Sequence, residues 1–173
     1  MRGAARSLAV RSVRKPQADM KQHASAASPL CIRPLSPTDL PVARRLLGEL
    51  GYAVADSELA RRVARVADAP DHLIVVAEED ARVIGLLRAF ERPALEKPCE
   101  VIVQALVVDA GLRRRGVGEA LMHAAEAWAA ARGQPSVALH TRSAQTFYAR
   151  LGYAKVASSD LMRKAVAAGV GKP

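Results

Sequence analysis

The densest positive charge of the sequence stands directly in front of two glycines, in the stretch LRRRGVGEAL at residues 112–121. A helical pattern of apolar residues begins at the same point, so the stretch is predicted to form the first turn of a helix. Free backbone N–H groups and the helix dipole attract anions there, and arginines add charge-assisted contacts. Gly116 and Gly118 would leave the backbone open to a phosphate group. These residue types predict a phosphate-binding turn, with a solvated basic turn and close glycine packing as the alternative.

The elements that must position this turn are predicted from periodicity and from chain breakers. A mostly buried strand at 99–109 precedes the turn, and an amphipathic helix at 116–133 follows it. Residues 72–79 and 82–91 flank a short polar segment, which is typical of an antiparallel hairpin. The complete expected set is strand 30–36, helix near 37–50, helix from Asp56, strands 72–79, 82–91 and 99–109, helix 116–133, strand 135–141, a short helix within 143–153 that ends at Gly152, and one or two strands within 153–166.

This order, β-α-α-β-β-β-α-β-α-β, predicts an α/β (α+β) domain with a mixed sheet flanked by helices. The first half of the sheet is expected to be largely antiparallel. The unit from Cys99 to Leu139 is expected to be a parallel β-α-β crossover. The sequence contains neither a G-x-x-x-x-G-K-[ST] loop nor a complete G-x-G-x-x-G fingerprint. These absences exclude the two commonest nucleotide-binding motifs.

The charge of the chain is concentrated in an N-terminal segment. The 173 residues carry a formal net charge of +9, but residues 1–28 hold six basic residues and one acid, so this segment contributes +5. A disordered basic tail, a transit-like segment and a start placed ahead of Met20 remain open, with the last preferred. We expect the folded domain at 29–167 and a C-terminal tail at 168–173. The modest charge of the remaining chain argues against a nucleic-acid partner.

The cysteines and histidines predict no metal or disulfide chemistry. Cys31 and Cys99 lack metal-ligand or C-x-x-C spacing, and the four histidines show no metal-ligand spacing either. No apolar run reaches the roughly 18 residues that a membrane helix requires. We therefore expect a cytoplasmic protein with reduced thiols, no bound metal and no membrane partner.

Two separated motifs resemble those of one enzyme superfamily. Arg113-x-x-Gly116-x-Gly118 matches the [QR]-x-x-G-x-[GA] turn of the GCN5-related N-acetyltransferase (GNAT) superfamily, and it lies between a strand and a helix as that family requires. Downstream, SAQTFYARLGY resembles the A-x-x-F-Y-x-x-x-G-[FY] segment of the same family. The first strand and helix and the hairpin also fit, so the resemblance covers residues 30–166.

The resemblance implies a GNAT-type fold with a mixed, mostly antiparallel sheet, and acetyl-CoA bound where the fourth and fifth strands separate. The residues implied to line the pantetheine arm are Leu106, Val107 and Val108. Those implied to surround the pyrophosphate are Arg113, Arg114, Arg115, Gly116, Val117 and Gly118. Instead of contacting the cofactor, the valines could simply pack in the core, and Arg114 could contact only solvent.

The same resemblance implies roles in acyl transfer. Tyr148 matches the tyrosine of the family's FY pair, which implies a general acid near the sulfur of coenzyme A. The alternative is that Tyr148 only packs beside Phe147. By analogy, the backbone amide of Val107 would stabilise the developing oxyanion.

The general base is not identified by the sequence. Relatives often carry a glutamate in the fourth strand, where this sequence has Gln104. Glu100 lies on the same strand but about 13 Å away at ~3.3 Å per residue. A water relay, an amine that arrives neutral, or His140 would serve instead. Thr141 stands where the family commonly has an asparagine that contacts the cofactor. The sequence leaves open whether Thr141 makes this contact.

The sequence thus predicts an acetyl-CoA-dependent N-acetyltransferase that acts on a primary amine of a small molecule or a protein. The alternative is a non-catalytic module on the same fold, which binds acyl-CoA or, through its basic tail, nucleic acid. The sequence does not decide the oligomeric state, and a homodimer is one possibility.

Overall fold

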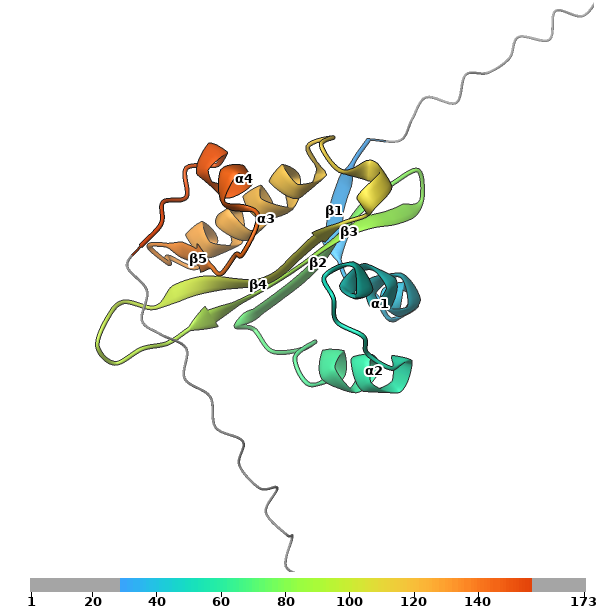
Figure 1. Cartoon of the computed structure of the whole chain (residues 1–173). Coiled ribbons are helices and arrows are strands. Elements are labelled where there is room, and N and C mark those ends of the chain that lie inside the picture. The colour runs from blue at the N-terminus through green and yellow to red at the C-terminus, as the bar shows by residue number, and fades with distance from the viewer. Residues whose placement is uncertain (1–28, 157–173) are drawn as a thin grey trace, which may run out of the picture.

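The structure is a computed structural model that describes residues 29–156, and its centre is a sheet of five strands (Figure 1). The strands lie side by side in chain order. Neighbours are antiparallel except β4 and β5, which are parallel. The expected hairpin, the parallel β-α-β unit and the mixed sheet are therefore confirmed. The strands are β1 Cys31–Pro34, β2 His72–Glu79, β3 Arg82–Arg92, β4 Glu100–Val108 and β5 Val137–Leu139.

Helices cover both faces of this sheet (Figure 1). A 3₁₀ turn, η1, comes just before α1, and a second, η2, lies between β4 and the arginine turn. Among the described helices, none is both long and apolar enough to span a bilayer. On one face lie α1 Leu40–Glu49 and α2 Asp56–Ala64, and on the other lie α3 Val117–Ala131 and α4 Gln145–Arg150; the 3₁₀ turns are η1 Pro37–Asp39 and η2 Ala110–Leu112.

Three expectations about the chain ends fall largely outside the described residues. Of the strand region predicted within 153–166, residues 153–156 have no regular structure and 157–166 lie outside. The predicted tails at 1–28 and 168–173 also lie outside.

Two apolar layers fill the space between the sheet and its helices. Alternate residues of a strand point to opposite faces, so neighbouring residues of β3 enter different layers. The layer under α3 includes Val75, Leu87, Val101, Val103, Val117, Leu121 and Met122. The layer under α1 and α2 includes Ala43, Leu46, Leu59, Val76, Leu86 and Val107.

A β-bulge in the middle of β4 changes which side chains face α3. Arg88 is opposite Ala105 and Ala89 is opposite Val103, so Gln104 is the extra residue. An inserted residue reverses the alternation of the strand beyond it. Val103 lies in the layer under α3 before the bulge, and Leu106 packs against that same layer after it.

The pairing between β4 and β5 ends at this bulge. The last parallel partners are Val103 and Leu139, while β4 continues to Val108. The second half of β4 therefore has β3 on one side and no described strand on the other.

Candidate active site

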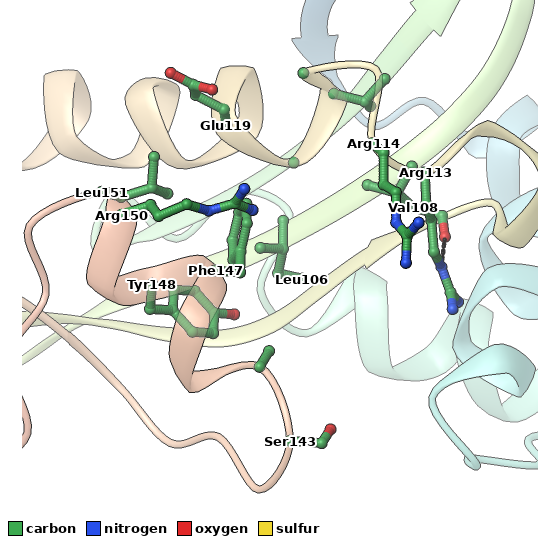
Figure 2. Close-up of a pocket in the computed structure, with 14 residues that line it drawn as sticks. Leu106, Val108, Arg113, Arg114, Glu119, Ser143, Phe147, Tyr148, Arg150 and Leu151 are labelled. Atoms are coloured by element: carbon green, nitrogen blue, oxygen red, sulfur yellow. Dashed lines mark hydrogen bonds between the residues drawn. The ribbon is translucent and has the colours of Figure 1, made fainter.

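A cavity of about 800 Å³ opens between the second half of β4 and helices α3 and α4 (Figure 2). Most of the residues that the sequence assigned to cofactor binding line it. Val107 does not, because it is 3% exposed in the apolar layer on the opposite face of the sheet. The lining residues are Leu106, Val108, Arg113, Arg114, Gly116, Val117, Gly118, Glu119, Ser143, Ala144, Phe147, Tyr148, Arg150 and Leu151.

The turn at one end of the cavity has a backbone shaped by left-handed conformations. Gly116 has φ +81° immediately before α3, and Arg114 has φ +65°. A Cβ added at Gly116 would meet nothing within 4 Å. Glycine is therefore required there by the left-handed backbone conformation, and not by a lack of space for a side chain. At Gly118 the reason is different, because an added Cβ would lie 3.3 Å from the ring of Phe147.

The first turn of α3 leaves its N–H groups free. The first helical hydrogen bond at this end runs from the N–H of Ala120 to the carbonyl of Gly116, at 2.9 Å. Within the described chain, the N–H groups of residues 116–119 donate to no other group. Together with the helix dipole, they form a site for an anion at the edge of the cavity.

Carboxylates from distant elements bind two of the three arginines. Arg113 donates through Nε to the carbonyl of Val108 at 3.1 Å and through Nη2 to Glu49 at 3.1 Å (Figure 2 shows the bond to Val108). Glu49 also accepts from the backbone N–H of Ala110 at 3.0 Å, so the end of α1 holds the turn in place. Arg115 pairs with Glu79 of β2 at 3.0 Å and does not line the cavity.

Two other arginines face the cavity without an acidic partner. The side chains of Arg114 and Arg150 make no ion pair or hydrogen bond with any described residue. Glu119 is the single acid of the lining, and in Figure 2 its carboxylate points away from Tyr148. The sequence interpretation missed Arg150. Its spacing of three from Phe147 within one short helix was the available signal, because residues three apart share a helix face.

Apolar and aromatic side chains form the rest of the wall. The rings of Phe147 and Tyr148 meet edge to face with centroids 4.9 Å apart, and Tyr153 lies 6.0 Å from Tyr148 in a similar arrangement. The hydroxyl of Tyr153 donates to Glu126 at 2.8 Å. The hydroxyl of Tyr148 has no partner among the described residues. Burial raises the pKa of Tyr148, so its phenol stays protonated at neutral pH.

Thr141 has a structural contact that accounts for its residue type. Its hydroxyl oxygen accepts a hydrogen bond from the backbone N–H of Ala144 at 3.0 Å, directly before α4. This bond fixes the loop that carries Ser143 and Ala144 along the cavity.

A smaller cavity of about 260 Å³ lies beside the β4 bulge and the end of β5. Its lining residues are Phe90, Arg92, Ile102, Val103, Gln104 and His140. Glu100, considered above as a base, binds Lys97 at 2.6 Å and also pairs with Arg92. These cations lower the pKa of Glu100, with Lys97 as the largest cause, so its carboxylate is a poor proton acceptor at neutral pH.

Comparison with known proteins finds relatives of this chain by sequence. Residues 42–153 match the sequence model of the acetyltransferase (GNAT) family. The chain is 33% identical over 109 residues to the acetyl transferase GW6a of Oryza sativa subsp. japonica, a match that covers 53% of this chain and 26% of that protein. It is 44% identical over 59 residues to N-alpha-acetyltransferase 80 of Mus musculus, which covers 34% and 19%. The chain thus spans about a quarter or less of these two relatives.

The fold is also that of a solved acetyltransferase. The aminoglycoside N-acetyltransferase AAC(6')-Iy in complex with CoA superposes with a TM-score of 0.70 at 22% identity, over 80% of this chain and 97% of that one.

Proposed function

This chain belongs to the acetyltransferase (GNAT) family, and on that basis we propose that it transfers the acetyl group of acetyl-CoA to a primary amine. The observation that carries the proposal is the anion site at the large cavity. Four free N–H groups at the start of α3 lie on the same cavity as Arg114 and Arg150, which have no acidic partner within the described chain. Such a site fits a diphosphate.

The remaining walls fit the other parts of the donor. Leu106 and Val108 give the cavity an apolar wall, and the edge of β4 beyond Val103 has no described strand beside it. An extended amide chain could pair with such an edge as an added strand does. In this proposal Arg114 and Arg150 bind the phosphates, while Arg113 holds the turn through Val108 and Glu49. The bound donor supplies the acyl group as a thioester.

Tyr148 is assigned as the general acid. When the amine nitrogen attacks the acyl carbon and the carbon–sulfur bond breaks, the sulfur takes a proton from the phenol, whose pKa is raised by burial. The attacking amine must give up a proton on the acceptor side. Gln104 cannot accept it, so His140 or a water molecule in the smaller cavity would do so.

Isothermal titration with acetyl-CoA tests the donor site. Each of the variants Arg114→Gln and Arg150→Gln is expected to weaken binding about tenfold or more, because a charge-assisted contact is worth roughly 1.5–3 kcal/mol. Arg65→Gln, which removes the same charge from an exposed position after α2, is the matched control and should bind as the wild type does. No detectable binding by the wild type, or equal losses in all three variants, would contradict the proposal.

The alternative of a non-catalytic acyl-CoA module is favoured by Gln104. By the resemblance to the family, this residue stands where relatives often carry a glutamate in the fourth strand. Release of free thiol in the presence of a panel of amines separates the two functions. Binding of acetyl-CoA without thiol release for any amine would support the module and exclude the transferase.

A further inference from the structure

Arg88, in the middle of β3, is a half-buried cation without an acidic partner. No hydrogen bond or ion pair joins its guanidinium to any described residue, and its contact is with the ring of Phe90, whose centroid lies 5.4 Å away. Burial alone shifts its pKa, in the downward direction. A guanidinium has five donors, and burying them unpaired is costly. The side chain is therefore suited to receive an anion from outside the chain.

The other charges near this position are already neutralised within the protein. Arg92 pairs with Glu100, and Glu100 also binds Lys97. Next to Arg92 on the same strand, Glu91 binds Arg132 at 2.7 Å. On β2 the imidazole of His72, which stacks on Phe90, meets Asp71 at 2.9 Å. Among these side chains, Arg88 is the one whose charge is not balanced by a described neighbour.

The placement of Arg88 relates it to the smaller cavity. Leu86 lies in the layer under α1 and α2, so the alternation of β3 puts Arg88 and Phe90 on that same face. Phe90 lines the smaller cavity, and the cross-strand neighbour of Arg88 is Ala105, directly after the bulged Gln104. Adjacent strands are about 4.8 Å apart. Arg88 is therefore about one strand spacing from the point where β4 and β5 separate.

We propose that the acceptor of this enzyme is an amine that also carries a carboxylate, and that Arg88 binds this carboxylate while the amine reaches the gap between β4 and β5. The inference rests on the proposed acetyltransferase function. The planar guanidinium matches a carboxylate with two parallel hydrogen bonds. Arg88 does not itself line the smaller cavity, which is lined by Phe90, the residue its guanidinium contacts. The cavity's volume of about 260 Å³ suits a small acceptor and is below the usual range for a drug-sized ligand.

The test compares ω-amino acids of one to five methylenes with their carboxamides, by thiol release from acetyl-CoA. For at least one chain length, the wild type is expected to prefer the carboxylate by about tenfold or more in kcat/KM, which corresponds to ~1.4 kcal/mol. Arg88→Gln should abolish this preference, so that the ratio of kcat/KM for the carboxylate to kcat/KM for its carboxamide falls to about one. Arg88→Lys keeps the positive charge but cannot make two parallel hydrogen bonds to the carboxylate, so it should retain an intermediate preference. This variant also shows whether the site tolerates substitution.

A matched control and two separate readouts make the outcomes distinguishable. Arg61→Gln removes an arginine whose side chain is 73% exposed on α2, and should keep the full preference. Equal kcat/KM for both series in the wild type, or an unchanged preference in Arg88→Gln, overturns the assignment of Arg88. If no amine of either series releases thiol, and none of the wider panel used to test the proposed function does so either, the proposed function fails. Calorimetry with the same ω-amino acids then tests the role of Arg88 without any turnover. Equal affinities of the wild type and Arg88→Gln would overturn the inference.

Discussion

Tyr148 leads to a prediction at the scale of a single residue, because its ring and its hydroxyl differ in their contacts. The ring packs edge to face between Phe147 and Tyr153, whereas the hydroxyl has no described partner. Tyr148→Phe should therefore keep acetyl-CoA binding and stability while kcat falls about 100-fold or more through loss of the general acid. Because burial raises the pKa of Tyr148, the alkaline loss of activity from its ionisation should lie above pH ~10. Steady-state thiol release across pH and calorimetry measure these effects.

Tyr153→Phe is the matched control for this prediction. It removes the hydrogen bond to Glu126 and keeps the ring contact with Tyr148. Its kcat should stay within a few-fold of the wild type even if the melting temperature drops. A Tyr148→Phe enzyme with wild-type kcat would leave Tyr148 with a packing role only.

At the same scale, the arginines show what sequence spacing cannot reveal. The resemblance assigned all three of Arg113, Arg114 and Arg115 to the pyrophosphate, and the structure separates them because Glu49 of α1 binds Arg113 and Glu79 of β2 binds Arg115. Which arginine is left for a ligand depends on contacts between residues 36 and 64 positions apart. No local pattern carries that information.

At the scale of elements, periodicity predicted the helices and strands around the site but not the register between them. Every described strand and α-helix was expected from sequence to within a few residues, because apolar repeats and glycine or proline breaks are local signals, whereas the 3₁₀ turn η2 was not expected. The bulge at Gln104 was not expected, since EVIVQALVV reads as one continuous buried strand. Because of this one inserted residue, Val107 points to the face of the sheet covered by α1 and α2, whereas Leu106 and Val108 line the large cavity.

The contact of α3 with β3 supplies the prediction at this scale. A Cβ added at Gly85 would lie 3.0 Å from Leu121 Cδ1, 3.2 Å from Val117 Cγ1 and 3.3 Å from Ala77 Cβ. Gly85→Ala should therefore push the first turns of α3 from the sheet, cost about 1–3 kcal/mol of the free energy of unfolding and weaken acetyl-CoA binding. Urea denaturation and calorimetry measure the two effects.

Gly48 in α1 provides the contrast, because an added Cβ there meets nothing within 4 Å. Gly48→Ala should keep acetyl-CoA binding and keep or raise stability, by up to about 1 kcal/mol, because alanine favours helix over glycine. If Gly85→Ala lowers stability while binding stays intact, the start of α3 does not depend on this contact for its position.

At the scale of the whole molecule, the sheet separates the two cavities. Leu106 and Val108 face the large cavity beside α3 and α4, whereas Phe90 and Ile102 line the smaller one on the face that carries α1 and α2. The place where β4 and β5 part is the connection between these faces. A donor bound on one face and an acceptor on the other would meet there, which is why a single register change in β4 matters for the whole site.

The link between β1 and η1, just before α1, contributes to the stability of this fold against acid. Arg33 of β1 binds Asp39 of η1 at 2.7 Å and also pairs with Glu78 of β2. The hydrogen bond from Arg33 is the largest cause that lowers the pKa of Asp39 from 3.8 to about 2, and the backbone N–H of Ser36 adds a second bond at 2.8 Å. A pKa lowered on folding stabilises the protein above the unfolded value, and this stability is lost as pH falls through the folded value. Asp39 should thus contribute about 2 kcal/mol at pH 7, lost between about pH 5 and 2.

Urea unfolding of the wild type and Asp39→Asn at both ends of this range tests the contribution. The two free energies of unfolding should differ by about 2 kcal/mol at pH 7 and by well under 1 kcal/mol at pH 2, because protonation removes the same charge that the substitution removes. Asp56→Asn removes a carboxylate that is 76% exposed in its pair with Arg44, and should change the free energy of unfolding by less than about 1 kcal/mol at either pH. A difference between wild type and Asp39→Asn that is the same at pH 7 and pH 2 would mean that the link stabilises the fold through its packing, and not through the charge of Asp39.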